Sequence, residues 1–321
     1  MVLPLCVLIA AGQGCREIIQ YDSNPPPGTR ESIVWERTSG LDGEAILSLR
    51  ADRDGNLYAG TAGGKLFRTI TDGEDWVPVH LPVNDGGITE IIVDPTRRIF
   101  IANDIHGVFA SVDNGLGWFQ LNGGLGDTMV YSLAYLPGGR LAAGTARGEI
   151  SVTGDSTPIW ELKADVARPV TSLLVISNEE IYASAWAGGI YRFGESSQTV
   201  VQVNAGLQDL FVNGLYSGGS GYLFAGTRSS GLYRSDIGNI FWQNVGGSTL
   251  SRDVIVFRST PYGELFAGTG SGIFLSTDMG LQWIKLDGGI GSREVRALAV
   301  NEEATVFAGT VDGVYRSIRV N

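Results

Sequence analysis

One tryptophan stands apart from the other six in this chain of 321 residues. Those six recur at intervals of about 41 or 42 residues, or twice that interval, whereas Trp186 lies between them in the short sequence AWAGG. An indole ring in a loop of small residues can stack on a sugar ring or on an aromatic side chain of a partner. It can equally pack against its neighbours, so Trp186 is a candidate binding residue with a packing alternative.

Polar and charged side chains occur in the short turns that match the position of Trp186. Arginine forks suit carboxylate groups, so four arginines gathered on an acidic protein could bind carboxylate-bearing ligands. Scattered arginines that only solvate the surface are the alternative. The further candidates for a ligand-binding face are Asn103, Asp104, His106, Arg147, Arg228, Arg252, Arg293 and Asp312.

The carboxylates of these turns raise the question of glycoside hydrolysis, which needs two carboxyl groups facing each other across the bond. Asp104 and Asp312 could face each other, and Glu44, Asp127 and Asp209 are further loop carboxylates. Nothing in the sequence selects a pair, so no catalytic residue is assigned. Two histidines, and two cysteines confined to the first fifteen residues, argue against a zinc site in the body of the chain. We expect no metal and no cofactor.

A repeated phrase indicates the elements that position these residues. LYAGT at 57–61 returns as LAAGT at 141–145, LFAGT at 223–227 and 265–269, and VFAGT at 306–310. An apolar run of strand length precedes each phrase and another follows it, with turn residues between them and no helical period. Seven such units of about 42 residues predict an all-β, seven-bladed β-propeller with four antiparallel strands per blade.

A second phrase, SVDNGLGW at 111–118, recurs as STDMGLQW at 276–283. Its aspartate can accept hydrogen bonds from turn amides, its glycine permits a positive φ, and its tryptophan can pack between blades. We therefore interpret it as a structural turn between the third and fourth strands of a blade. The residues concerned are Ser111, Asp113, Gly115, Trp118, Ser276, Asp278, Gly280 and Trp283.

This phrase resembles the Asp-box (BNR) repeat, S-x-D-x-G-x-T-W, over nearly all of residues 34–318. The repeat occurs in sialidases, xyloglucanase-like enzymes, the sortilin family and photosystem II assembly factors. The resemblance implies a propeller whose Asp-box turns lie on the face opposite the ligand site. It implies little about function, because one fold serves many functions.

The last unit lacks a fourth strand, since only four residues follow GVYRS at 313–317. The segment VWERT at 34–38 is in the correct phase to supply it, with Trp35 placed 41 residues before Trp76. We predict that this N-terminal strand completes the last blade and closes the ring, which removes two exposed sheet edges.

The N-terminus predicts export. Residues 2–11 are mostly apolar and too short to span a bilayer, and small residues then lead to Cys15. This resembles a bacterial lipoprotein signal in which Cys15 carries the lipid; a plain signal peptide is the alternative. The expected domains are a signal at 1–15, a Pro-rich tether at 16–33 and the propeller at 34–321.

The net charge of -11 argues against nucleic acid as a partner.

From the N-terminal signal we expect an exported monomer in the bacterial periplasm or cell envelope, attached to the membrane only through the possible lipid anchor. The favoured function is a non-catalytic binding or scaffold platform for a protein or carbohydrate partner. A glycoside hydrolase of sialidase or xyloglucanase-like type and a sensor-type ligand-binding propeller are the alternatives.

Overall fold

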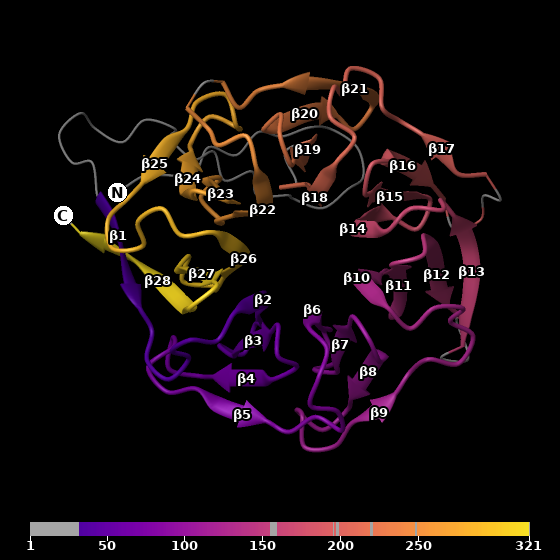
Figure 1. Ribbon diagram of the computed structural model, residues 1–321, viewed down its shortest axis with the longest axis horizontal. Coiled ribbons are helices and arrows are strands. Elements are labelled where there is room, and N and C mark those ends of the chain that lie inside the picture. Colours follow the sequence, from indigo (N-terminus) through magenta and orange to yellow (C-terminus); the bar gives the residue numbers. More distant parts are fainter. Residues whose placement is uncertain are drawn as a thin grey trace, which may run out of the picture.

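The fold is a ring of seven four-stranded antiparallel sheets around a central axis, which confirms the predicted seven-bladed propeller (Figure 1). The computed structural model describes residues 32–154, 159–194, 196, 199–218, 221–247 and 249–320. Cys15 and the proposed signal and tether lie outside these residues, apart from the last two positions of the tether. Within the described ranges there is no helix long and apolar enough to cross a membrane.

In the first six blades, the innermost strand comes first in the chain and the outermost strand comes last. The first blade contains β2 (Ile46–Ala51), β3 (Leu57–Thr61), β4 (Leu66–Thr69) and β5 (Val77–Val79), and the second contains β6 (Ile88–Val93), β7 (Ile99–Asn103), β8 (Gly107–Ser111) and β9 (Phe119–Gln120). The third contains β10 (Val130–Leu136), β11 (Arg140–Thr145), β12 (Glu149–Thr153) and β13 (Trp160–Asp165), and the fourth contains β14 (Val170–Ser177), β15 (Glu180–Ala185), β16 (Gly189–Phe193) and β17 (Val201–Gln202). The fifth contains β18 (Val212–Tyr216), β19 (Tyr222–Thr227), β20 (Leu232–Asp236) and β21 (Asn239–Asn244), and the sixth contains β22 (Val254–Ser259), β23 (Leu265–Thr269), β24 (Gly272–Ser276) and β25 (Ile284–Leu286).

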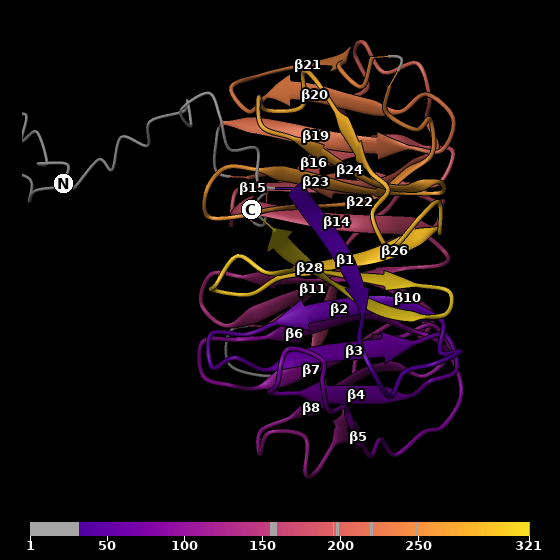
Figure 2. The ribbon, with the colours of Figure 1, turned by 90° about the vertical axis from the view of Figure 1, so that its left-hand side faces the viewer.

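The seventh blade joins the two ends of the chain. It contains β26 (Val295–Val300), β27 (Val306–Thr310) and β28 (Gly313–Val320), and its outer strand is β1 (Ser32–Arg37). The antiparallel pairing of β1 and β28 places Trp35 opposite Ser317, which confirms the predicted ring closure (Figures 1 and 2). The strand starts two residues before the predicted 34–38 and ends one residue earlier, because pairing begins where Ser32 lies opposite Val320.

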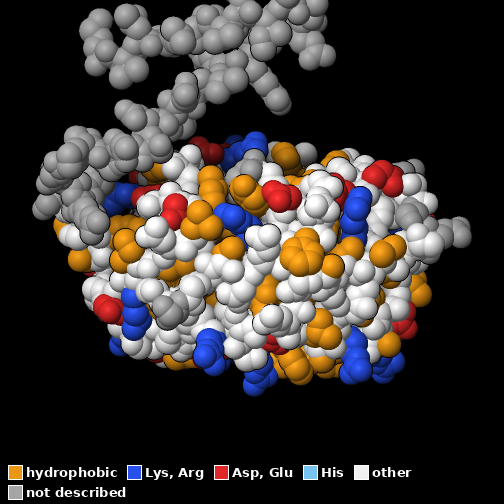
Figure 3. Space-filling view, turned by 90° about the horizontal axis from the view of Figure 1, so that it is seen from above, with side chains coloured by type: hydrophobic (Ala, Val, Ile, Leu, Met, Phe, Trp, Pro, Cys, Tyr) orange, Lys and Arg blue, Asp and Glu red, His pale blue; other side chains and the backbone are white. Residues whose placement is uncertain are grey.

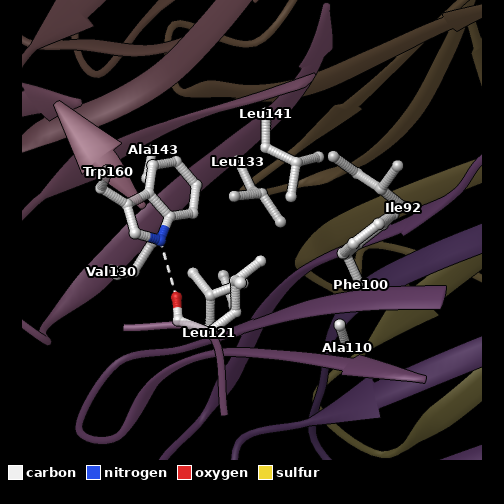
Figure 4. Packing of buried hydrophobic residues seen from close by; sticks show 11 residues of the cluster. Ile92, Phe100, Ala110, Leu121, Val130, Leu133, Leu141, Ala143 and Trp160 are labelled. Atoms are coloured by element: carbon white, nitrogen blue, oxygen red, sulfur yellow. Dashed lines mark hydrogen bonds between the residues drawn. The ribbon is translucent and has the colours of Figure 1, made fainter. Parts of the chain in front are cut away.

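Seven hydrophobic clusters hold the blades together, one at each interface between consecutive blades. Figure 4 shows the cluster between the second and third blades, where Trp160 packs beside Ala143 and Val130. The indole Nε1 of Trp160 donates a hydrogen bond of 2.6 Å to the carbonyl of Leu121 in the preceding blade. The periodic tryptophans therefore act as fillers between sheets, as large apolar rings do in a two-sided core.

The AGT phrase is explained by the close approach of neighbouring blades. A Cβ atom on Gly144 would lie 2.4 Å from Cγ1 of Val170 in the next blade and 2.5 Å from the Ser132 hydroxyl. The following Thr145 is fully buried, and its hydroxyl accepts a hydrogen bond from the Glu149 amide. The glycine thus lets the inner strands approach, and the threonine fixes the turn that follows.

The outer strands expose apolar side chains on the wall of the ring. They include Val77, Phe119, Leu162, Val201, Phe241 and Ile284. On the part of the wall that faces the viewer in Figure 3, apolar side chains are interspersed with polar and charged ones. Isolated exposed apolar residues of this kind are ordinary on a soluble protein.

The two complete copies of the SxDxG phrase form the same hydrogen-bonded turn. Ser111 donates to Asp113 (2.8 Å), which accepts the Gly117 amide (2.8 Å), while the Ser111 hydroxyl accepts the Gly115 amide (2.8 Å). In the second copy Ser276, Asp278 and Gly280 make the matching bonds. Gly115 has a φ of 87° and Gly280 a φ of 84°, values that favour glycine.

Each tryptophan of these turns folds back on its own glycine. Trp118 Nε1 donates to the Gly115 carbonyl (3.2 Å), and Trp283 Nε1 donates to the Gly280 carbonyl (2.9 Å). The serine, aspartate and tryptophan side chains of the phrase are thus engaged within the turn, and we describe it as a structural clasp. Its assignment to the Asp-box family stays a prediction.

Candidate functional site

The chain direction separates the turns of the propeller into two faces. Turns between the second and third strands of a blade share one face with the connections between blades, because both follow strands that run the same way. We call this the loop face; it carries Trp186. The clasp turns and the turns between first and second strands lie on the opposite face, which we call the clasp face.

Trp186 and Arg228 occupy the same position in consecutive blades, directly after β15 and β19. The main chain continues the strand pairing at both, since the Trp186 amide donates to Pro169 and the Arg228 amide donates to Phe211. The Arg228 guanidinium lies 5.0 Å from the centre of the Trp186 ring, within the range of a cation–π interaction. Phe211 meets the same indole edge to face, with ring centres 5.3 Å apart.

The loop face also carries exposed apolar side chains. Phe211 remains 39% exposed even though it touches Trp186. Other large exposed apolar residues on loop-face turns and connections are Ile105, Met129, Leu210 and Val311. Aromatic rings beside a guanidinium group, on a face with exposed apolar groups, are the usual composition of a protein-binding hot spot.

Several carboxylates of this face are engaged in fixing turns. Asp127 accepts the amides of Met129 (3.1 Å) and Arg147 (3.2 Å). Asp209 accepts the Phe211 amide (2.9 Å) and both the amide and hydroxyl of Ser229 (2.9 and 2.8 Å). Burial alone would raise the pKa of Asp209, but these hydrogen bonds hold it below its usual value. Both residues tie the connection between two blades to the next inner turn.

The carboxylates considered as a hydrolytic pair are also engaged. Asp104 accepts the Gly87 amide at 2.7 Å, and Glu44 pairs with Lys65. Asp312 accepts the Thr310 hydroxyl (2.7 Å) and pairs with Arg293 (3.2 Å). Against the effect of burial, these partners keep the pKa of Asp312 low. A general acid needs a raised pKa, so the environment of Asp312 favours a structural role.

Asn103 and His106 belong to one turn of the second blade. Asn103 is fully buried, and its side chain bonds to the main chain of Asp85, Gly86, Ile105 and His106. His106 Nε2 lies 2.6 Å from Asp85 Oδ1. Asn103 therefore shapes the turn from inside, while His106 and Asp85 are at the surface.

The four candidate arginines do not share one environment. Arg228 stacks on Trp186, whereas Arg293 pairs with Asp312 and lies over the ring of Tyr315. Arg147 and Arg252 are exposed on other connections and turns of the loop face. Only Arg228 is seen in contact with the aromatic pair.

Sequence reasoning missed Asp253, a carboxylate next to the loop face whose pKa is raised. Burial, reinforced by the charge of Glu294, raises the pKa of Asp253, whereas a hydrogen bond from Asn213 and the charge of Arg228 oppose this shift. Asp253 directly precedes β22, at the inner end of a connection between blades. Its position just before an inner strand was visible in the sequence, but its raised pKa depends on burial and on residues from other segments of the ring.

Sequence reasoning also missed a cavity at the clasp-face end of the central axis. Its volume is about 910 Å³, and its walls come mainly from the ends of inner strands in six of the seven blades and from the turns that follow them. Arg50 and Arg258 line it together with Tyr135 and Tyr216. Nothing in the local sequence separates these arginines from ordinary strand residues, because the ring alone brings them together.

Metal binding finds no support among the described residues, which contain no group of three or more His, Cys, Asp or Glu side chains placed to hold an ion. The carboxylates described above bond mainly to amides, hydroxyls and arginines instead.

No protein-family profile matches the sequence, and no curated protein matches it either. Solved structures resemble it in fold. The extracellular domain of BT3049, described as a hybrid two-component system of B. thetaiotaomicron, has a TM-score of 0.74 and 16% identity, and the match covers 89% of this chain and 42% of that one. YCF48 bound to D1 peptide has a TM-score of 0.72 and 16% identity over 92% of this chain and 99% of that one. A streptogramin B lyase has a TM-score of 0.72 and 13% identity over 90% and 98%.

The chain is a seven-bladed β-propeller, as these structures are. It spans less than half the length of the two-component protein domain that it matches. At such identities the likeness shows the fold alone, and function must be argued from the site.

Proposed function

We propose that the protein is a non-catalytic binding platform and that a protein partner docks on its loop face around Trp186, Phe211 and Arg228. The observation that carries the proposal is the aromatic pair with a guanidinium 5.0 Å from the indole centre, on a face with exposed apolar groups. Short connections fix these groups on rigid strands, so little conformational entropy is lost on binding. A partner that presents apolar side chains beside a carboxylate would complement them.

The engaged carboxylates support binding over hydrolysis. Asp209 and Asp312 have lowered pKa values and hold turns, which suits neither a general acid nor a free nucleophile. A binding role also agrees with what two fold neighbours are, an extracellular domain and a propeller bound to a peptide. Those properties belong to the neighbours and are an analogy for this chain.

Site-specific photo-crosslinking in intact cells of the source organism tests the proposal. A photoreactive residue at Met129 on the loop face should give a discrete protein adduct that disappears when Trp186→Ala or Phe211→Ala is added. The matched control places the same group at Leu116, an 89% exposed apolar residue on the clasp face. Equal adducts from both positions, or adducts that survive both substitutions, would contradict the proposed docking face.

A carbohydrate partner or a hydrolase is distinguished with the purified protein and a panel of polysaccharides and sialylated glycans. Retention without product, abolished by Trp186→Ala, would make the partner a glycan. Released sugar that is lost in Asp253→Asn would replace binding by hydrolysis, because Asp253 has the raised pKa expected of an acid.

We also propose that the protein is exported as a monomer and anchored in the envelope through Cys15. Fractionation of cells that express wild type and Cys15→Ser tests this. Wild type should sediment with membranes and the variant should be released, whereas identical fractionation would contradict the anchor. Light scattering of the released form should give the mass of one chain.

A further inference from the structure

The cavity on the clasp face contains two arginines whose charges are poorly compensated. Arg50 from β2 and Arg258 from β22 lie two blades apart, with β26 of the seventh blade between them. Each of these inner strands has a bulge near its start. Arg50 and Arg258 lie at the same distance along the chain after that bulge, and the corresponding residue of β26 is Ala299. Ala299 also lines the cavity, and its small side chain leaves space between the two arginines.

Both guanidinium groups have N–H donors that no other described residue engages. Nε of Arg50 is shielded from solvent and has no hydrogen-bond partner among the described residues. Arg258 donates from Nη1 to the neighbouring Phe257 carbonyl at 2.8 Å, which uses one of its five N–H groups. Buried polar groups are normally paired, so an unpaired Arg50 Nε at the wall of a cavity indicates a missing acceptor.

The acidic residues of the same cavity are mostly committed to other partners. Asp52 holds its turn through the Asp54 and Asn56 amides, and Asp54 pairs with Arg97. Asp94 is bound by Arg98 at 2.7 Å and by its own turn. Asp54 and Asp94 are therefore each paired with another arginine, whereas the charge of Asp52 still acts on Arg50 without a direct ion pair.

Glu302 also lines the cavity, and Glu90 is a further acidic neighbour of both arginines. Glu90 lies on β6, the inner strand of the second blade. Its position there matches that of Ser48 on β2, which precedes Arg50 by two residues. Burial raises its pKa, while the charges of Arg258 and Arg50 oppose the shift. Two guanidinium groups in one cavity, one of them with an unpaired buried Nε, favour an added anion because like charges repel each other.

Part of the wall is apolar and aromatic. Tyr216 is held by hydrogen bonds of its hydroxyl with the Ser259 hydroxyl (2.7 Å) and amide (2.9 Å), so its ring has a fixed place. Other apolar wall residues are Leu49, Val93, Tyr135, Leu265 and Val300. A ligand that fills this space would present an apolar body as well as a negative charge.

We propose that this cavity binds an organic anion, with Arg50 and Arg258 holding an ionised carboxylate and the apolar wall holding an apolar or aromatic body. Two guanidinium forks can take both oxygens of one carboxylate, which is the geometry they suit best. The site lies on the face opposite the proposed docking face, so either can exist without the other. A free organic acid and the carboxyl end of a peptide share the required chemistry.

Calorimetric titration of the full chain with 3-phenylpropanoate and its neutral amide tests the site. The acid should bind at millimolar concentration or below, and the amide should bind at least about tenfold more weakly, since charge-assisted hydrogen bonds are lost. A tetrapeptide ending in Phe, with a free or amidated carboxyl end, forms the second arm. Tighter binding of the free peptide than of the small acid assigns the ligand to a chain end, and the reverse assigns it to a free acid.

Substitutions identify the residues. Arg50→Gln and Arg258→Gln should each weaken the acid about tenfold or more and leave the amide unchanged. Arg192→Gln is the matched control, because it removes one positive charge from β16, outside the cavity. Three results would overturn the proposal. They are equal affinities for acid and amide, no binding of 3-phenylpropanoate or of the free tetrapeptide, and unchanged binding of the acid by both arginine variants. Unchanged circular dichroism and melting temperature show that a variant is folded.

Discussion

Closure of the ring by β1 gives a prediction whose size follows from the structure. Trp35 is 3% exposed, and its ring meets Phe266 edge to face with centres 6.5 Å apart. Its amide donates to the Gly288 carbonyl at 2.8 Å, so the main chain ties β1 to the connection before the seventh blade, while the ring packs on the sixth blade. Replacing such a buried tryptophan by alanine costs about 3–5 kcal/mol.

The indole of Trp35 differs from that of Trp160 in one respect. Nε1 of Trp35 has no hydrogen-bond partner among the described residues, whereas Nε1 of Trp160 donates to Leu121 at 2.6 Å. Trp35→Phe should therefore cost little beyond lost packing. Trp160→Phe should cost about 1–3 kcal/mol more, because it leaves the Leu121 carbonyl unpaired in a buried site.

Thermal unfolding followed by calorimetry measures the series. At about 2 °C per kcal/mol for a domain of this size, Trp35→Ala should lower the melting temperature by roughly 6–10 °C. Removal of residues 1–39 should lower it further, because the six-residue pairing with β28 is lost as well. It should also increase self-association by exposing a strand edge. An unchanged melting temperature after truncation, or a larger loss for Trp35→Phe than for Trp160→Phe, would refute this reasoning.

Two further predictions concern stability. Gly144→Ala should destabilise the protein by about 1–3 kcal/mol in urea unfolding, because the new methyl group would lie 2.4 Å from Val170; an unchanged midpoint would show that the blades can separate at no cost. Asp209 has a lowered pKa in the folded state, so the unfolded state binds more protons and stability should fall as pH drops below about 4. Asp209→Asn should be less stable at neutral pH and lose less on acidification, and parallel pH profiles for variant and wild type would argue against this role.

The repeat allowed much of the fold to be predicted from the sequence. The spacing of AGT phrases depends on local strand length and turn chemistry, which every blade repeats, so blade number and ring closure follow from counting. The ends of β1 were misplaced because pairing with β28 extends to Ser32, and no local signal marks where a strand on the outside of a blade begins. Ring closure itself was predictable, since Trp35 shares the phase of the other tryptophans.

The loop face was predictable in outline and not in detail. Trp186 was recognisable because it breaks the tryptophan period, and its contact with Arg228 follows from their matching positions in consecutive blades. Phe211 was missed, since a single aromatic residue in a connection between blades carries no periodic signal. That Asn103 is buried was also not predictable, because its amide looks like any polar turn residue until its four main-chain partners are known.

Positions at which the blades differ carry the candidate functions. The position of Trp186 and Arg228 holds Ala62, Ala146 and Gly270 in other blades, whose amides make the same main-chain bond. Because that bond is independent of the side chain, the position can change without cost to the fold. The same holds for the position of Arg50 and Arg258, which is alanine in β10 and β26.

The two ends of the central axis have therefore diverged in different directions. On the loop face the changed residues form an aromatic and apolar surface on rigid turns, which suits a large partner. On the clasp face they place two cations in a cavity of about 910 Å³, which suits a small anionic group. Since a ring of seven packed interfaces separates the ends, substitutions at one should leave binding at the other unchanged; loss of loop-face crosslinks in Arg50→Gln would show that the two sites are coupled.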